Sequence, residues 1–325
     1  MRVYFIRRLL ALIPMFFLMT ATYFCIQNYL PGGPVQEAIA KMTGMGDGGG
    51  RVLTPSDIKK LRHELEIQYG LDKPVWTRYF VWVKNILTLN FGNSLTTRSP
   101  AMEQIIQRFP ISLSFGIPSF FLTYFICIPL GVMMALKDGS KFDSLSSFFL
   151  FIFYSIPALV FAIIFLLVFC TDRILPHGAL FPLGGWRSDN YETLSFIQKI
   201  LDIAHHMFLP VLASLFSNFT ILTFLQKNSM LEVIRAVIFK HALRNALLPL
   251  MVGFGTLLGT FLGGSIIIEP IFGLPGLGVL SLQALAARDF NVIMAIVVLQ
   301  SGAILLGQLI TDVAYVLIDP RIEYR

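Results

Sequence analysis

Few residues in this 325-residue chain are of a type and spacing that could do chemistry. His205 and His206 are the nearest approach to a pair of metal ligands, but adjacent residues on a helix point about 100° apart. We therefore expect the two histidines to cap an apolar segment, with metal binding as the alternative. The chain contains no Gly-x-x-x-x-Gly-Lys-Ser/Thr phosphate loop, which excludes this way of binding ATP. We predict no catalytic residue, no cofactor and no metal in the chain.

The cysteines and the acidic residues give no sign of redox or proton-transfer chemistry. Cys25, Cys127 and Cys170 all lie in apolar stretches, without the spacing of a Cys-x-x-Cys site or a disulfide framework. We expect them to be small buried apolar residues. A proton-coupled carrier needs acidic or histidine side chains within its helices, and the apolar stretches hold only Asp312. We expect Asp312 to pair with a cytoplasmic-side base or a helix N-terminus.

Long apolar stretches must position these residues. The chain is 55% hydrophobic and 14% charged, whereas an average soluble domain is roughly 25% charged. About 20 apolar residues cross the hydrocarbon core of a membrane. The predicted spans are residues 9–30, 111–136, 145–170, 207–225, 246–268 and 292–317. We predict an all-α polytopic membrane protein of about six helices.

The predicted spans divide the chain into three parts. Residues 1–30 form an N-terminal transmembrane helix, 31–110 an extracytoplasmic region with amphipathic helices, and 111–325 a five-helix core. We expect the first helix to stay uncleaved, because its apolar run is longer than that of a signal peptide and no Ala-x-Ala site follows.

The net charge of +6 is distributed as an orientation signal rather than as a nucleic-acid surface. With the N-terminus inside, the short cytoplasmic segments carry eleven basic residues and the short outer segments carry four. The cytoplasmic ones are Arg2, Arg7, Arg8, Lys137, Lys141, Lys227, Arg235, Lys240, Arg244, Arg321 and Arg325. The outer ones are Arg173, Arg187, Lys199 and Arg288. Because basic residues gather on the cytoplasmic side, we predict that both termini face the cytoplasm.

Two outer segments are predicted to have structure of their own. Pro74 suits the first residue of a helix, and the aromatic and basic residues that follow it favour a helix in the membrane interface. An aromatic RNA-binding stripe is the alternative. In the second outer loop, Gly184, Gly185 and Trp186 indicate a turn with an interfacial anchor.

Two features point to a translocation path. Pro157 lies within the third predicted span and should kink it; a kink without function is the alternative. Glu269 follows an apolar run and begins a segment rich in glycine and proline. Such a turn is tolerated at membrane depth only where it is buried in protein or lines a cavity. We predict an outer gate at 269–278, with an ordinary connector as the alternative. The candidate gate and path residues are Pro157, Glu269, Pro270, Phe272, Gly273, Pro275 and Gly276.

Several blocks run in order through almost the whole chain and carry a resemblance to a known family. They are Pro31-Gly32-Gly33-Pro34-Val35, Gly70-Leu71-Asp72-Lys73-Pro74, Arg78-Tyr79, Trp82, Phe91-Gly92-Asn93-Ser94, Ile128-Pro129-Leu130-Gly131-Val132, Ser155-Ile156-Pro157-Ala158, the run from Glu269 to Gly278, and Ile318-Asp319-Pro320-Arg321. In these blocks the chain resembles the B-type permease of dipeptide and oligopeptide importers in the ATP-binding-cassette superfamily. It is most similar to the microcin C-type peptide permeases.

The resemblance implies a fold, a function and a set of partners. It implies the type I importer permease fold in a bacterial inner membrane, with a second permease completing the path as a heterodimer. Two cytoplasmic ATPase subunits would bind the ATP, and an extracytoplasmic peptide-binding protein would deliver peptide. An uncoupled peptide channel or a regulatory membrane subunit is the alternative function. Nickel or another small solute is the alternative substrate.

The cytoplasmic loop between the fourth and fifth helices departs from the family's pattern. In the family this loop carries Glu-Ala-Ala-x-x-x-Gly and contacts the ATPase. Here residues 228–233 and 240–249 match its two ends, and its middle is missing near Arg235 and Ala236. Either the deletion is real, which would join the two helices directly, or the residues are absent only from this sequence. The remnant of the ATPase-coupling loop comprises Glu232, Arg235, His241 and Arg244.

Overall fold

Helices make up nearly all of the regular structure. The computed structural model describes residues 2–29, 39, 58–60, 62–64, 72–172, 179–236, 259 and 261–318. Its elements are α1 (Arg2–Tyr29), α4 (Val75–Leu87), α5 (Ala101–Leu136), α6 (Lys141–Ser155), α7 (Ala158–Phe169), the 3₁₀ turn η1 (Tyr191–Thr193), α8 (Phe196–Ala236), α11 (Ile268–Ile271), α12 (Leu277–Ala286) and α13 (Phe290–Ile318). In this part of the chain the one extended pairing is a single bridge between Asn93 and Pro100. The all-α prediction is confirmed.

The described residues contain four or five helices that could cross a membrane. Four are long and apolar enough alone: α1, α5, α13 and the first half of α8. The pair α6 and α7 would be a fifth span if counted together. The span predicted at 246–268 lies mostly outside the described residues. With 36 residues, α5 is roughly 54 Å long at about 1.5 Å per residue, well over the ~30 Å of the hydrocarbon core. It begins at Ala101, before the span predicted at 111–136, and so it crosses residue 110, the predicted end of the outer region.

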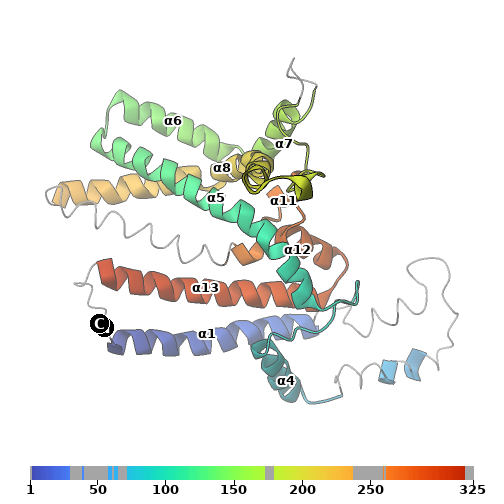
Figure 1. Ribbon diagram of the computed structural model, residues 1–325. Coiled ribbons are helices and arrows are strands. Elements are labelled where there is room, and N and C mark those ends of the chain that lie inside the picture. The colour runs from blue at the N-terminus through green and yellow to red at the C-terminus, as the bar shows by residue number, and fades with distance from the viewer. Residues whose placement is uncertain are drawn as a thin grey trace.

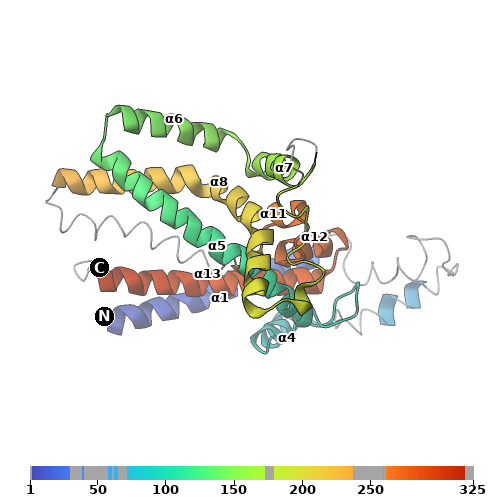
Figure 2. The ribbon, with the colours of Figure 1, turned by 45° about the horizontal axis from the view of Figure 1, so that its top comes forward.

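The ends of the helices separate into two groups. Figures 1 and 2 show α1 and α13 side by side, with α5, α6 and α8 stacked beyond them. The N-terminal end of α1, the α5–α6 turn and the C-terminal ends of α8 and α13 lie at one end of the molecule (Figure 2). The helices α4, α11 and α12 lie at the other end. The chain thus brings the segments predicted to be cytoplasmic together and keeps them apart from those predicted to be outer.

The helices α5 and α8 approach each other closely at a glycine. A Cβ added to Gly131 of α5 would lie 2.8 Å from both the Cβ of Gln226 and the carbonyl oxygen of Thr223. Small residues let helices in membranes approach closely. Farther along the same pair, Cys127 and Met134 of α5 pack in one apolar cluster with residues of α6 and α8.

The helix α4 packs across α1 and confirms the helix predicted after Pro74. Tyr79 and Val83 of α4 are buried against Phe24 of α1. The hydroxyl of Tyr79 donates to the carbonyl oxygen of Phe17 at 3.1 Å. On the opposite face Trp76 and Phe80 are exposed, as an interfacial helix requires.

One contact of α1 tests the prediction for Asp312. Arg8 donates from Nε to Asp312 on α13, which confirms that Asp312 pairs with a base at the predicted cytoplasmic end.

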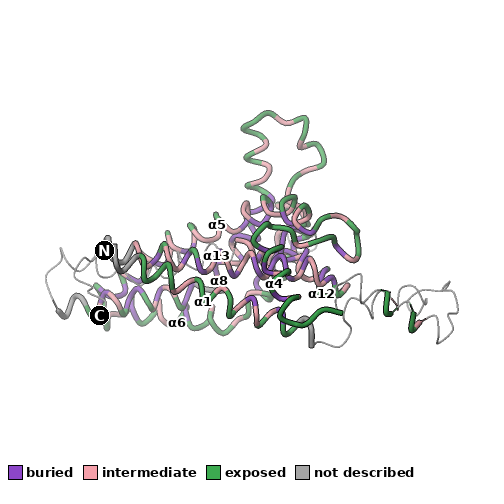
Figure 3. Tube along the Cα trace, turned by 90° about the horizontal axis from the view of Figure 1, so that it is seen from below, coloured by how far each residue is buried: buried purple, intermediate pink, exposed green. Residues whose placement is uncertain are grey.

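Cys127 and Cys170 are buried as expected, but Cys25 is exposed. The expectation was wrong for Cys25 because α1 packs mainly against α13 and α4 in the described chain, and most of its residues stay exposed (Figure 3).

A closed hairpin, an elbow and a coupling extension

Glu269 is fully buried, and its carboxylate is held by four donors. One oxygen, Oε1, accepts from the hydroxyl of Ser112 and from the backbone N–H of Ser265, both at 3.0 Å. The other, Oε2, accepts from the backbone N–H of Gly278 at 2.7 Å and of Val279 at 3.1 Å. A buried charge is costly unless it is paired and hydrogen-bonded. Here hydrogen bonds to both oxygens offset that cost.

The same carboxylate caps the N-terminus of α12. The first N–H groups of a helix lack partners within the helix, and in α12 they belong to Leu277, Gly278 and Val279. The last two donate to Glu269, and Leu277 donates to the Ser112 hydroxyl at 2.8 Å. A negative charge is also favoured there by the helix dipole. Glu269 and Ser112 therefore close residues 264–279 into a hairpin, which we call the Glu269 hairpin.

Glycines allow the Glu269 hairpin to close around the carboxylate. A Cβ on Gly276 would lie 2.6 Å from Oε2 of Glu269. A Cβ on Gly278 would lie 2.4 Å from the carbonyl oxygen of Ser265. Gly264 has a φ of +63°, and a Cβ there would lie 2.3 Å from the N atom of Gly278. Since real Cβ atoms do not approach other atoms so closely, these three positions have no room for a side chain.

Ser112 is the participant that sequence reasoning missed. It lies on α5, 157 residues from Glu269, inside a long apolar stretch. A serine in a helix usually bonds to a carbonyl of the preceding turn, so its presence in the stretch gives no signal of a distant partner. The signal available was indirect: a buried carboxylate needs donors, and Ser112 is one of several serines and threonines in the apolar spans.

The second outer loop packs onto the Glu269 hairpin. The N–H of Gly185 donates to the carbonyl oxygen of Phe272 at 3.1 Å, and Gly185 has a φ of +88°. The predicted turn is thereby confirmed. Trp186 packs against the apolar cluster that contains Phe272 and Leu274. It is thus partly buried inside the protein and is not a fully exposed anchor.

The structure brings six of the seven candidate gate residues together. These six are Glu269 itself and five other residues of the Glu269 hairpin. Phe272 and Gly276 are buried and the others are exposed, namely Pro270, Gly273 and Pro275. Pro157 lies elsewhere, at the break between α6 and α7.

The predicted kink at Pro157 is a sharp elbow. The two helices meet at 90° across the break, and Ile156 is extended with φ −99° and ψ 120°. A residue before proline disfavours the helical conformation, which explains why α6 ends at Ser155. The elbow directs α7 toward α8 and α11, which it contacts.

A second outer contact fixes the block that contains Ser94. Ser94 donates its hydroxyl to the carboxylate of Asp289, and the N–H of Thr96 donates to the same oxygen at 3.3 Å. The side-chain amide of Asn291 donates to the carbonyl oxygen of Asn93 at 2.7 Å. Asp289 also caps α13, because it accepts from the N–H of Val292 at 3.4 Å. The outer region is thereby tied to the start of α13.

The two histidines bond to separate carbonyl groups. The ring of His205 contacts the carbonyl oxygen of Leu180 at 3.0 Å, and that of His206 contacts the carbonyl oxygen of Asp202 at 2.9 Å. Among the described residues no group of three or more His, Cys, Asp or Glu could hold a metal ion. His205 therefore links the second outer loop to α8, whereas the bond of His206 stays within α8.

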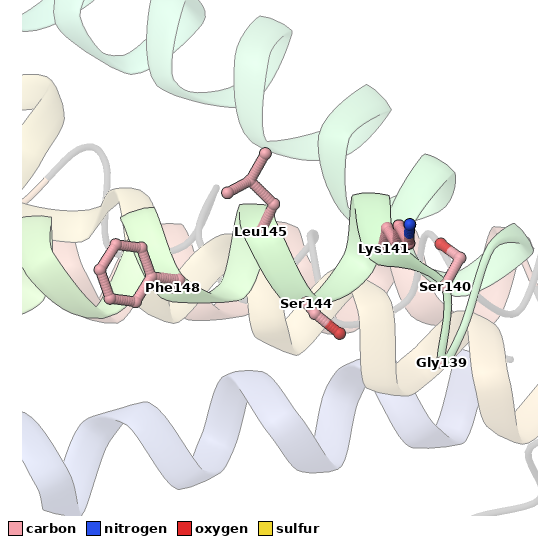
Figure 4. A pocket seen from close by; sticks show the side chains of 6 residues that line it. All are labelled: Gly139, Ser140, Lys141, Ser144, Leu145 and Phe148. Atoms are coloured by element: carbon pink, nitrogen blue, oxygen red, sulfur yellow. The ribbon is translucent and has the colours of Figure 1, made fainter.

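The coupling-loop remnant is described only in its first part, where it continues α8. Glu232 is exposed on this helix. Arg235 belongs to the last turn of α8, but its side chain is outside the described part of the chain, as are His241 and Arg244 altogether. A pocket beside the nearby α5–α6 turn (Figure 4) is lined by Gly139, Ser140, Lys141, Ser144, Leu145 and Phe148. It lies at the opposite end of the molecule from the Glu269 hairpin and takes no part in it.

The spanning helices and the closed hairpin between them define a polytopic helical membrane protein, and comparison with known proteins gives its family. The model of a family described as the inner membrane component of binding-protein-dependent transport systems matches residues 127–236 and 235–324. The chain belongs to this family and is a permease subunit of the inner membrane. Permeases of this kind act with ATPase and substrate-binding partners.

Three relatives match over nearly their whole length. The inner membrane ABC transporter permease protein YejB of Escherichia coli O157:H7 is 35% identical, over 100% of this chain and 99% of the relative. The oligopeptide transport system permease protein AppB of Bacillus subtilis (strain 168) is 34% identical over 100% of both chains. The dipeptide transport system permease protein DppB of Escherichia coli (strain K12) is 30% identical over 99% of both. The resemblance to dipeptide and oligopeptide permeases is confirmed.

The comparisons also bear on the shortened loop. The two stretches matched by the family model meet at Arg235 and Ala236, the position at which the sequence predicts that the middle of the loop is missing. The alignment with YejB extends over 368 positions, more than the 325 residues of this chain. The relatives therefore contain segments that this chain lacks.

Proposed function

We propose that this chain lines the translocation path of an ATP-driven peptide importer together with a second permease. Two ATPases on the cytoplasmic side drive the cycle, and an extracytoplasmic binding protein delivers peptide. The observation that carries the proposal is the full-length similarity to peptide permeases such as AppB and DppB. The chain itself hydrolyses no ATP, in keeping with a sequence that has no phosphate loop.

The proposed orientation follows from the two groups of helix ends. The end that holds the α5–α6 turn and the C-terminus of α8 carries Lys137, Lys141 and Lys227. Because basic residues favour the cytoplasmic side, this end faces the cytoplasm. The Glu269 hairpin then faces outward.

The Glu269 hairpin acts as this chain's part of the outer gate. Its backbone groups are satisfied inside the protein by Glu269 and Ser112, which makes a re-entrant turn tolerable at membrane depth. The second outer loop is bonded to it through Gly185, so the two move as one unit. A binding protein that presses on the outer loop would thereby act on the gate.

Uptake by the reconstituted transporter tests the proposal. The chain, a second permease, two ATPases and the binding protein are placed in proteoliposomes with a labelled short peptide. We expect peptide to accumulate only with ATP and with every subunit present. The chain alone should neither hydrolyse ATP nor move peptide uphill. Accumulation against a gradient by the chain alone would overturn the proposal, and equilibration without ATP would indicate an uncoupled channel.

A further inference from the structure

Lys227 of α8 is buried at the predicted cytoplasmic end, where it joins two carboxylates. Its Nζ lies 2.6 Å from Oδ1 of Asp143 and 3.1 Å from Oδ1 of Asp138. The side chains of Lys227 and Asp143 are only 11% and 10% exposed. A buried ion pair differs from a surface pair because removing one partner strands the other charge away from water.

The carboxylate of Asp143 connects Lys227 to the whole α5–α6 turn. Its second oxygen, Oδ2, accepts from the N–H of Gly139 at 3.1 Å, and Gly139 has a φ of +72°. The N–H of Asp143 donates to the hydroxyl of Ser140, the N-cap of α6, at 3.3 Å. One carboxylate therefore bonds to the turn with one oxygen and to α8 with the other.

The neighbouring residue Gln226 adds no polar contact. It is fully buried against Gly131 of α5, and neither atom of its side-chain amide has a hydrogen-bond partner in the described part of the chain. A buried amide without a partner disfavours the arrangement that contains it. In this turn of α8 the polar contact with the α5–α6 turn is therefore made by the ion pair of Lys227, beside the apolar packing of Met230 on Ala135.

We propose that Lys227 is a positioning residue for transport: its ion pair with Asp143 and Asp138 makes α6 follow the ATPase-facing end of α8. Beyond Lys227, α8 continues past the exposed Glu232 to Ala236. In the other direction α6 leads through the elbow to α7, which packs in one apolar cluster with Phe272 of the Glu269 hairpin. The ion pair is therefore a side-chain link on a continuous route between the two ends. This inference rests on the proposed ATPase coupling.

Three variants of the complete transporter test the proposal. Lys227→Met removes the cation, and Lys227→Arg keeps it. The triple variant Lys227→Met, Asp143→Asn and Asp138→Asn removes the link without leaving a buried charge unpaired. Each is measured in proteoliposomes for peptide uptake, basal ATPase activity, stimulation of the ATPase by loaded binding protein, and co-purification with the ATPase.

We expect the Met variant and the triple variant to lose about tenfold or more of uptake and of stimulation, with basal ATPase activity and co-purification kept. The Arg variant should retain uptake within about twofold. A triple variant that transports within about twofold of the parent would overturn the proposal and leave the ion pair a structural role only. If the parent itself does not co-purify with the ATPase, the proposed function fails, which distinguishes that outcome from failure of the link.

Discussion

Two buried charges lie at opposite ends of this permease, and they are satisfied in different ways. Glu269 accepts four hydrogen bonds, three of them from backbone N–H groups of its own hairpin. Lys227 has two carboxylates as partners, Asp138 of the α5–α6 turn and Asp143 of α6, and its neighbour Gln226 has an amide without a hydrogen-bond partner among the described residues. Backbone donors of one hairpin are held by local geometry, whereas side chains of separate elements are not. The outer site therefore stabilises one hairpin, whereas the inner site joins two helices.

The largest expected loss of stability follows removal of the outer carboxylate. Glu269→Ala leaves the first N–H groups of α12 without partners in a buried place. Hydrogen bonds to charged groups contribute about 1.5–3 kcal/mol each, so we expect a loss of about 3 kcal/mol or more. Thermal unfolding of the purified protein in detergent measures it. The exposed Glu232→Ala is the control, and an equal effect of the two would contradict the role of Glu269.

Adding a methyl group beside the same carboxylate should lower the stability somewhat less than removing the carboxylate does. In Gly278→Ala the new Cβ meets the carbonyl oxygen of Ser265 at 2.4 Å and Oε2 of Glu269 at 2.9 Å. Overpacking of this kind costs typically about 1–3 kcal/mol. Gly302→Ala is the matched control, because nothing lies within 4 Å of its added Cβ. Comparable melting temperatures for the two variants would show that the hairpin is looser than described.

Ser112→Ala sharpens the comparison by removing one donor from α5. The hydroxyl both donates to Glu269 and accepts from the N–H of Leu277, so we expect a loss of about 1–3 kcal/mol. Ser114→Ala is the control on the same helix, since among the described residues its hydroxyl bonds only the carbonyl oxygen of Ile111. The melting temperature should fall for the first variant and stay near that of the parent for the second. No difference between them would remove Ser112 from the hairpin's support.

The smallest effect is expected where a charge pair reaches solvent. The side chains of Arg8 and Asp312 are 45% and 14% exposed, so the pair reaches solvent through Arg8, and exposed ion pairs contribute about 0–1 kcal/mol. Arg8→Gln should therefore change stability by no more than this amount. Arg7→Gln is the control, because it removes the same charge from an exposed neighbouring residue. A large loss specific to Arg8 would place a third important charge in the molecule.

The features that depend on local sequence pattern could be predicted from the sequence. Hydropathy predicted the spans formed by α1, α5 and α13, and Pro157 predicted the break between α6 and α7. The segment of Glu269 was recognised from its glycines and prolines. Local pattern could not supply partners that are distant along the chain. Ser112 and Glu269 are 157 residues apart, and Asp143 and Lys227 are 84 apart.

The stability of the triple neutral variant at Lys227, Asp143 and Asp138 tests the contrast between the two ends most directly. Replacing all three charges leaves none unpaired, so the melting temperature should stay within about 2 °C of the parent although uptake is lost. Glu269→Ala, measured beside it, should melt about 5 °C or more below the parent. A triple variant that melts as low as Glu269→Ala would contradict the account, because the inner ion pair would then hold the fold together as the outer carboxylate does.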